Sequence, residues 1–244
     1  MIDWTAINSP VNEKEAIKAA KQWCNSALLQ IDEKLSKEQI TFKQTLYLQF
    51  AGYLLRAQDE LPREQWLAAN LGMSTIEFQV EGWNELCRNR YRVSFALLRP
   101  IFEASIYTMA CAVVPSFVEQ WYNNQLKRGT IQNIFKALLP KMGEGWIQAL
   151  KKKWDMLNEV AHANLFPSQA VWVRANSVSG LEAPAIPVFG GIFKEETARY
   201  LSSLYCEISK DALVAQGLCI VAPREDYPLW YQNHDRVVLE NQGI

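Results

Sequence analysis

The sequence predicts a mainly α-helical protein: a multi-helix bundle with a long central helix and a small β-hairpin insertion near residues 170–191, all in one domain spanning residues 1–244. Three observations support this prediction. Apolar residues recur at helical spacing through most of residues 12–161. A serine followed three residues later by Glu or Gln, the pattern of a helix-starting capping box, occurs at Ser36, Ser74 and Ser116. Runs rich in β-prone residues gather between residues 170 and 191.

Composition narrows the class of protein. The chain has 244 residues, 49% of them apolar, which is enough for a sizeable core. Its 25 basic and 26 acidic residues leave a net charge of −1, which argues against broad electrostatic binding to nucleic acid and leaves a local basic groove open. The five cysteines include no CxxC pair, so we interpret them as reduced core residues of a cytoplasmic protein.

Each helix is delimited by residues that begin or end helices. Asn12 and the three serines are caps, Pro62 ends one helix, and Gly72 is expected to end the short helix through Trp66. The expected helices are residues 12–34, 36–61, a short one that stops near 72, one from 74 that leads into the central helix 84–114, and then 116–127, 130–142, 145–161 and 194–216. Gly82 is expected to break or bend the segment that leads into the central helix, and Pro100 to kink it. Two prolines limit the second strand of the hairpin to a sheet edge, and an irregular tail is expected over residues 218–244.

The central helix, from about Asn84 to Val114, is apolar on more than one side, so neighbours should cover most of it. The stretch Val93–Val114 is long enough to cross a membrane. Arg99, Pro100 and Glu103 lie in its middle, however, and charges at that depth are costly. We therefore expect a core helix and no membrane partner.

Four charged residues on this helix, Arg88, Arg92, Arg99 and Glu103, fall within a narrow stripe if the helix is continuous. Charges on a buried helix need partners, so Arg99 and Glu103 are expected to be mostly buried and hydrogen-bonded. Two interpretations remain open: a structural network of ion pairs, or the lining of a site.

A second polar group lies where the helix 145–161 ends. Asp155, Asn158, Glu159 and His162 fall on one face at helical spacing. They are either a solvated face that ends in a histidine favoured by the helix dipole, or a general acid/base, His162, with Asn158 one turn before it. The run Lys151–Lys153 is read as solvated surface, and two histidines without cysteine clusters give a metal site little to build on.

The order of these motifs carries a resemblance. The helix Leu98-Arg99-Pro100-x-Phe102-Glu103-Ala104, followed by Asn158-x-x-x-His162 and a hairpin, resembles uncharacterised bacterial helical families distantly related to HEPN domains. The similarity covers roughly residues 84–216. The HEPN signature is an Arg, a polar residue, three variable residues and a His. Here Asn158 and His162 match it, and Leu157 occupies the Arg position.

The resemblance implies a helical bundle, often dimeric, and a metal-independent ribonuclease in a toxin or phage-defence system. It implies RNA and a second copy of the chain as partners, with no cofactor and no metal. His162, Arg99, Glu103 and Asn158 would then be catalytic, and Arg92 and Arg88 would bind substrate. The alternative is a non-catalytic helical protein that binds a protein or a small ligand through the same residues.

Overall fold

The computed structural model describes residues 13–56, 62–114, 116–126, 130–161 and 195–221, and the structural statements below refer to these ranges. They are helical and contain no strand, which confirms the predicted helical bundle. The predicted hairpin, His162 and residues 222–244 of the tail lie outside them. The elements are α1 (Glu13–Ala27), η2 (Glu33–Leu35), α2 (Ser36–Arg56), α3 (Arg63–Cys87), α4 (Tyr91–Val113), α5 (Phe117–Tyr122), α6 (Thr130–Met142), α7 (Glu144–Ala161), α9 (Glu195–Gln216) and η3 (Gly217–Val221).

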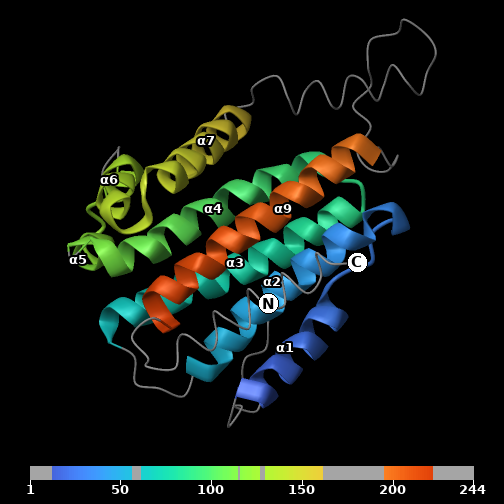
Figure 1. Ribbon diagram of the computed structural model, residues 1–244, viewed down its shortest axis with the longest axis horizontal. Helices are drawn as coiled ribbons and strands as arrows, with labels where there is room; N and C mark the ends of the chain where they lie inside the picture. Colours follow the sequence, from blue (N-terminus) through green and yellow to red (C-terminus); the bar gives the residue numbers. More distant parts are fainter. Residues whose placement is uncertain (1–12, 57–61, 115, 127–129, 162–194, 222–244) are drawn as a thin grey trace, which may run out of the picture.

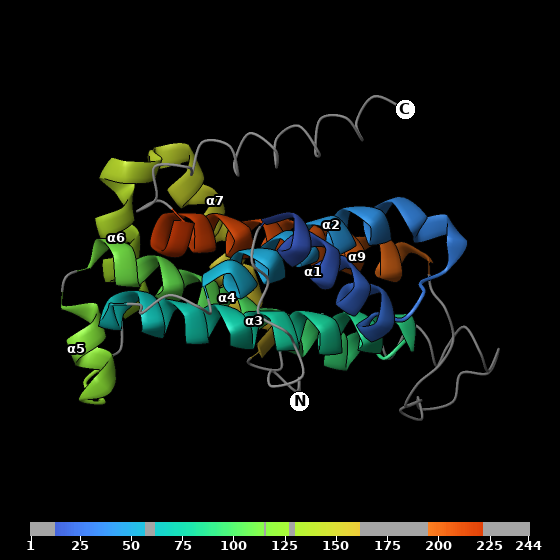
Figure 2. The ribbon, with the colours of Figure 1, turned by 90° about the horizontal axis from the view of Figure 1, so that it is seen from below.

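Four long helices, α2, α3, α4 and α9, form the centre of the bundle (Figure 1). Helix α9 packs against the other three, although it follows them by about eighty residues or more in the chain. Helix α1 lies along α2, α5 and α6 lie at one end of α4, and α7 runs beside α4 (Figures 1 and 2). One apolar core joins residues from α1 to η3, so the described helices share a single core.

Side-chain contacts give the directions of the central helices. The start of α4 contacts α9 through Ser94 and Tyr205, and its end contacts η3 through Thr108 and Cys219, so α4 and α9 run parallel. Helix α2 is parallel to α9 as well, because Lys34, just before α2, pairs with Glu195 at the start of α9 and Gln216 at the end of α9 reaches Gln49. Helix α3 runs the opposite way.

The core combines aromatic packing with a small polar network. Phe42 and Trp83 stack with centroids 4.3 Å apart, and the Tyr205 ring meets both edge-on. One turn or more along the bundle, buried amides and a hydroxyl join α2, α3 and α9: Gln49 donates to Ser209 and exchanges hydrogen bonds with Gln79. Buried amides cost free energy unless they are paired, so this network favours one alignment of the three helices.

Helix α3 corrects the predicted boundaries near Gly72, Ser74 and Gly82. It is continuous from Arg63 to Cys87, and Ser74 donates its hydroxyl to the Asn70 carbonyl instead of capping a new helix. Gly72 and Gly82 lie inside the helix, and each leaves room for the phenol of a tyrosine on a neighbouring helix. A Cβ at either position would overlap that phenol. From the sequence, these glycines were expected to interrupt the helix. In the structure they are places where a neighbouring helix packs closely against α3.

The predicted continuous helix from Asn84 is wrong at its start. Helix α3 ends at Cys87, Asn89 adopts a left-handed conformation with φ of 60°, and α4 begins at Tyr91. The amide of Arg90 donates to the Glu85 carbonyl and that of Asn89 to the Leu86 carbonyl, the bonding pattern of a Schellman helix end. Asparagine tolerates the left-handed region better than most residues, which allows the chain to reverse here.

Helix α4 packs against α3 and α9 along most of its length. Within the described part of the chain, it is the helix whose length and composition would suit a membrane span. Pro100 does not end it: the proline and Ala96, whose carbonyl loses its helical partner, lie on the side of the helix that solvent can reach. Its buried face, which includes Leu98, Ile101 and Phe102, belongs to the common core.

Candidate functional site

The ion pair predicted on the central helix is present and faces α7. Arg99 Nε donates to Glu103 Oε1 at 3.0 Å, which confirms the expected hydrogen bond. The Arg99 guanidinium carbon lies 5.5 Å from the ring centroid of Trp154 on α7. The side chains of Arg99 and Glu103 are 30% and 28% exposed, so the pair is half-buried and water still reaches it. A phosphate could approach this guanidinium from solvent.

Tyr107 extends the same line of side chains by one turn and was not singled out from the sequence. Burial raises the pKa of its phenol, the Glu103 carboxylate raises it further, and Arg99 lowers it. Its ring packs against Phe117 and Trp121. The spacing of Arg99, Glu103 and Tyr107, four residues apart in each step, was visible in the sequence. Its apolar surroundings made the tyrosine look like a core residue.

Helix α7 runs antiparallel to α9 and to α4. Its Lys153 contacts Asp211 of α9, and its later residue Met156 contacts Tyr200, which comes earlier on α9. Since α4 is parallel to α9, α7 is antiparallel to α4 as well. Asn158, which is half-buried, follows Trp154 by about one turn. Because the two helices are antiparallel, Asn158 lies nearer the start of α4 than Trp154 does. Arg92, which is exposed, lies on that part of α4, two turns before Arg99.

Leu157 occupies the position of the signature arginine, and its side chain is only 1% exposed. It belongs to the apolar core together with Ile147 and Leu150 of the same helix. An arginine side chain at this position would be buried among these residues at a large cost in free energy. A guanidinium at the site has to come from another helix, and Arg99 of α4 contacts Trp154 of α7.

The remaining predicted site residues are separated from this group or lie outside the described ranges. Arg88 lies in the turn after α3 and pairs with the buried Glu85 at 2.7 Å, and Arg90 pairs with the same carboxylate at 3.2 Å. The turn therefore divides the predicted stripe, with Arg88 before it and Arg92, Arg99 and Glu103 on α4. His162 directly follows the last described residue of α7.

The lysine run on α7 does not behave as one solvated surface. Lys151 and Lys152 are exposed and, with Asp155 and two neighbours, line an open hollow of about 460 Å³. Lys153 points the other way and donates to Asp211 Oδ2 at 2.7 Å. The side chains of Lys153 and Asp211 are 19% and 8% exposed, so this is the most deeply buried ion pair among the described residues.

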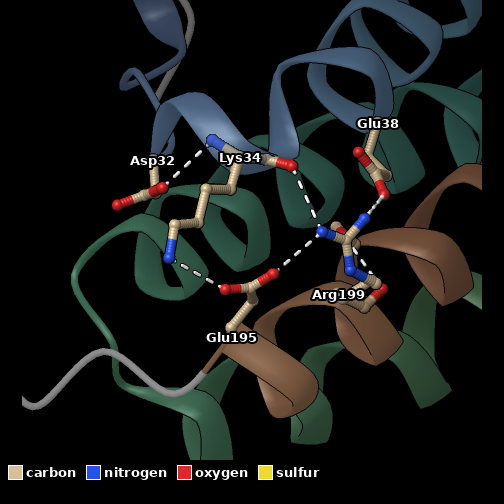
Figure 3. Close-up of polar contacts among 6 residues, drawn as sticks. Asp32, Lys34, Glu38, Glu195 and Arg199 are labelled. Atoms are coloured by element: carbon tan, nitrogen blue, oxygen red, sulfur yellow. Dashed lines mark hydrogen bonds and ion pairs between the residues drawn. The ribbon is translucent and has the colours of Figure 1, made fainter.

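A second charged cluster joins the starts of α2 and α9 (Figure 3). Arg199 donates to Glu38 and Glu195, both at 3.1 Å, and Lys34 pairs with Glu195 at 3.0 Å. The hydrogen bond from Lys34 lowers the pKa of Glu195. Carboxylates suit this end because parallel helices direct the positive ends of their dipoles there. Both cations are paired with carboxylates, so we interpret the cluster as structural.

A second hollow, of about 680 Å³, lies between α5 and α6 and carries no charged side chain in its lining. Amides and a hydroxyl dominate it: Gln120, Asn124, Gln125, Leu126, Thr130 and Asn133. Within the ranges that the structure describes, no group of three His, Cys, Asp or Glu side chains is placed to hold a metal ion.

Comparison with known proteins adds no relative. No family model matches the chain, and no curated protein and no solved structure matches it either. The candidate site joins the two helices where Arg99 of α4 meets Trp154 of α7. Its other residues are Glu103, Tyr107 and Arg92 on α4 and Asn158 on α7.

Proposed function

We propose that this chain is a HEPN-like protein that acts on RNA at the seam between α4 and α7, as a metal-independent ribonuclease of a toxin or phage-defence system. One observation carries the proposal. The guanidinium of Arg99 lies against the ring of Trp154 on α7. Trp154 comes one turn before Asn158 on that helix, and His162 is the residue that follows the end of the helix in the sequence. An arginine from α4 thereby stands close to the motif that has Leu157 in place of its own arginine.

The roles follow from the chemistry of each group. Arg99, with Arg92 two turns nearer the start of α4, would bind the phosphate that is attacked, because a guanidinium presents paired donors to its oxygens. Glu103 would hold Arg99 in place through the 3.0 Å hydrogen bond. His162 would move the proton of the RNA 2′-hydroxyl or of the leaving oxygen, and Asn158 would orient it. Arg88, paired with Glu85, would contribute at most at the edge.

The test is cleavage of a panel of labelled RNAs at low salt in EDTA. We expect His162→Ala to lower the cleavage rate by about 10² to 10⁴-fold, the usual contribution of a histidine acid/base, while RNA binding persists. Arg99→Lys should also impair cleavage, because a point charge cannot replace a two-pronged contact with phosphate.

Arg63 offers a matched control for Arg99. It also pairs with a glutamate, Glu119 at 2.7 Å, and lies over an aromatic ring, Tyr122 at 4.3 Å, but on α3 and α5, away from the seam. Arg63→Lys should leave cleavage unchanged. Wild-type protein that neither binds nor cleaves RNA at low salt would contradict the proposal.

The second candidate is a non-catalytic helical protein that binds a partner or a small ligand. Two observations favour it: Glu103 already neutralises Arg99, and the hollow lined by Gln120, Asn124 and Asn133 offers uncharged amides to a polar ligand. RNA cleavage that depends on His162 would exclude it. A ligand whose binding is lost on Asn133→Leu and kept on His162→Ala would support it.

A further inference from the structure

The buried ion pair between α7 and α9 lies beside the apolar side of α7, which packs mainly against α4 and α6. The side of α7 that faces the bundle carries Ile147, Leu150 and Leu157, all at most 2% exposed. Lys153 falls within this line, and its ammonium reaches Asp211 Oδ2 at 2.7 Å. Two charges in an apolar contact cost desolvation energy, which a well-placed pair recovers only in one geometry.

Apolar side chains alone allow several alignments of α7 along α4, because a slip by one turn replaces one apolar contact by another. A slip of four residues would move Trp154 about 6 Å along α4, away from the guanidinium of Arg99. Lys153 distinguishes these alignments, since only the present one brings its ammonium to Asp211. Buried polar pairs that select one register are known from coiled coils.

Helix α9 also holds a second carboxylate for Lys153. Glu207 lies one turn before Asp211, its Oε2 is 3.8 Å from the Lys153 ammonium in the present alignment, and its side chain is 56% exposed. If Asp211 lost its charge, Glu207 would be the carboxylate left beside Lys153. Because Glu207 lies nearer the start of α9, tightening this weaker pair would draw α7 toward that end.

We propose that Lys153 and Asp211 are a positioning pair that sets the register of α7, so that Trp154 and Asn158 face Arg99. The inference rests on the proposed function for its consequence, and on the ion pair between Lys153 and Asp211 for its geometry. The pair acts through α7 and touches no RNA. Its loss changes where α7 lies and, through that, the action at the seam.

The register of α7 can be measured directly by the distance between spin labels at Ala149 on α7 and Ser203 on α9, which are both exposed. Each position is changed to cysteine, and RNA cleavage in EDTA is followed in parallel. Asp211→Asn should shift or broaden the distance distribution by several ångströms, up to about one helical turn. It should also lower cleavage at least about 10-fold, since misplacement by an ångström can cost more than that.

Three further variants sharpen the test. Asp211→Asn combined with Glu207→Gln leaves Lys153 without either carboxylate. The distance between the two spin labels should then show a broad distribution and no second defined value. The exchanged pair, Lys153→Asp with Asp211→Lys, should restore both the distance and cleavage. Lys152→Met is the matched control: Lys152 is the exposed neighbour, and its loss should change neither measurement.

The outcomes separate the two proposals. An unchanged label distance in Asp211→Asn overturns the positioning role, whatever happens to RNA. A shifted distance in a protein whose wild type does not act on RNA supports the positioning pair and contradicts the proposed function. If Asp211→Asn does not fold, Lys153→Met with Asp211→Leu restores an apolar contact; a distance in that variant as sharp as in the wild type would overturn the proposal.

Discussion

The phenol oxygen of Tyr205 occupies the space that a side chain on Gly82 would need. From this position the phenol donates to the Ser94 carbonyl at 2.6 Å, so one tyrosine of α9 packs into α3 and bonds to α4. Burial raises the pKa of Tyr205 well above its ordinary value. The contact explains why a glycine lies in the middle of a long helix, and it leads to a stability prediction.

Gly82→Ala should destabilise the protein by about 2 kcal/mol, because overpacking typically costs 1–3 kcal/mol and outweighs the helix preference of alanine, about 1 kcal/mol. Gly145→Ala is the control: nothing lies within 4 Å of a Cβ there, and the change should be neutral or stabilising. Urea denaturation measures both. Adding Tyr205→Phe to Gly82→Ala should recover part of the loss, and strictly additive losses would contradict this account.

Lys153→Met should destabilise the protein by roughly 3 kcal/mol at neutral pH, because it leaves the Asp211 carboxylate buried without its partner. The loss should shrink on acidification. Burial raises the pKa of Asp211 above its ordinary value even with Lys153 present, and removing the lysine raises it further. Because the pKa of Asp211 is higher in the folded protein than in the unfolded one, protonation of this carboxyl favours folding. Its contribution to the free energy of unfolding is fully present below the ordinary pKa of 3.8 and is lost as pH rises through the pKa of the folded state.

The measurement is the urea midpoint of Lys153→Met and of the wild type between about pH 4 and pH 7.5. The difference between the two proteins should be smallest at the acid end. A difference that stays constant over this range would mean that Asp211 does not titrate there. Lys152→Met should show no such pH dependence, because Lys152 is exposed.

Arg99→Leu should destabilise the protein by only about 1 kcal/mol. The side chains of Arg99 and Glu103 are 30% and 28% exposed, and partly exposed ion pairs contribute much less than fully buried ones. A fully enclosed pair would have cost about 3 kcal/mol on losing one partner. Thermal or urea denaturation distinguishes the two values, and a loss near the larger one would show that water does not reach Glu103.

The native protein should react slowly with thiol reagents such as a disulfide dye at pH 8. Burial raises the pKa of Cys24, Cys87, Cys111 and Cys206 to about 12, and the thiolate is the reactive form. Cys219 is buried, and its thiol lies against the Thr108 carbonyl. Unfolding in guanidinium should expose all five thiols at once. Rapid reaction of any of them in the native state would contradict this prediction.

The helical content and most of the helices followed from the sequence because apolar spacing of three and four residues is a local property. The sequence also located the ion pair of Arg99 and Glu103, which are one turn apart on a single helix. It misjudged Gly72 and Gly82, because whether a glycine ends a helix or admits a neighbour depends on a tyrosine far away in the chain.

The tertiary structure alone decided which helices share a face. Nothing local to α9 indicates that it runs between α2 and α4, or that Asp211 meets Lys153. It also decided that Arg99 contacts Trp154, while Arg88, assigned to the same stripe, belongs to a turn with Glu85. Sequence patterns determine which surface a helix buries; the partner on that surface depends on packing between residues that are distant in the chain, where shape and charge must match together.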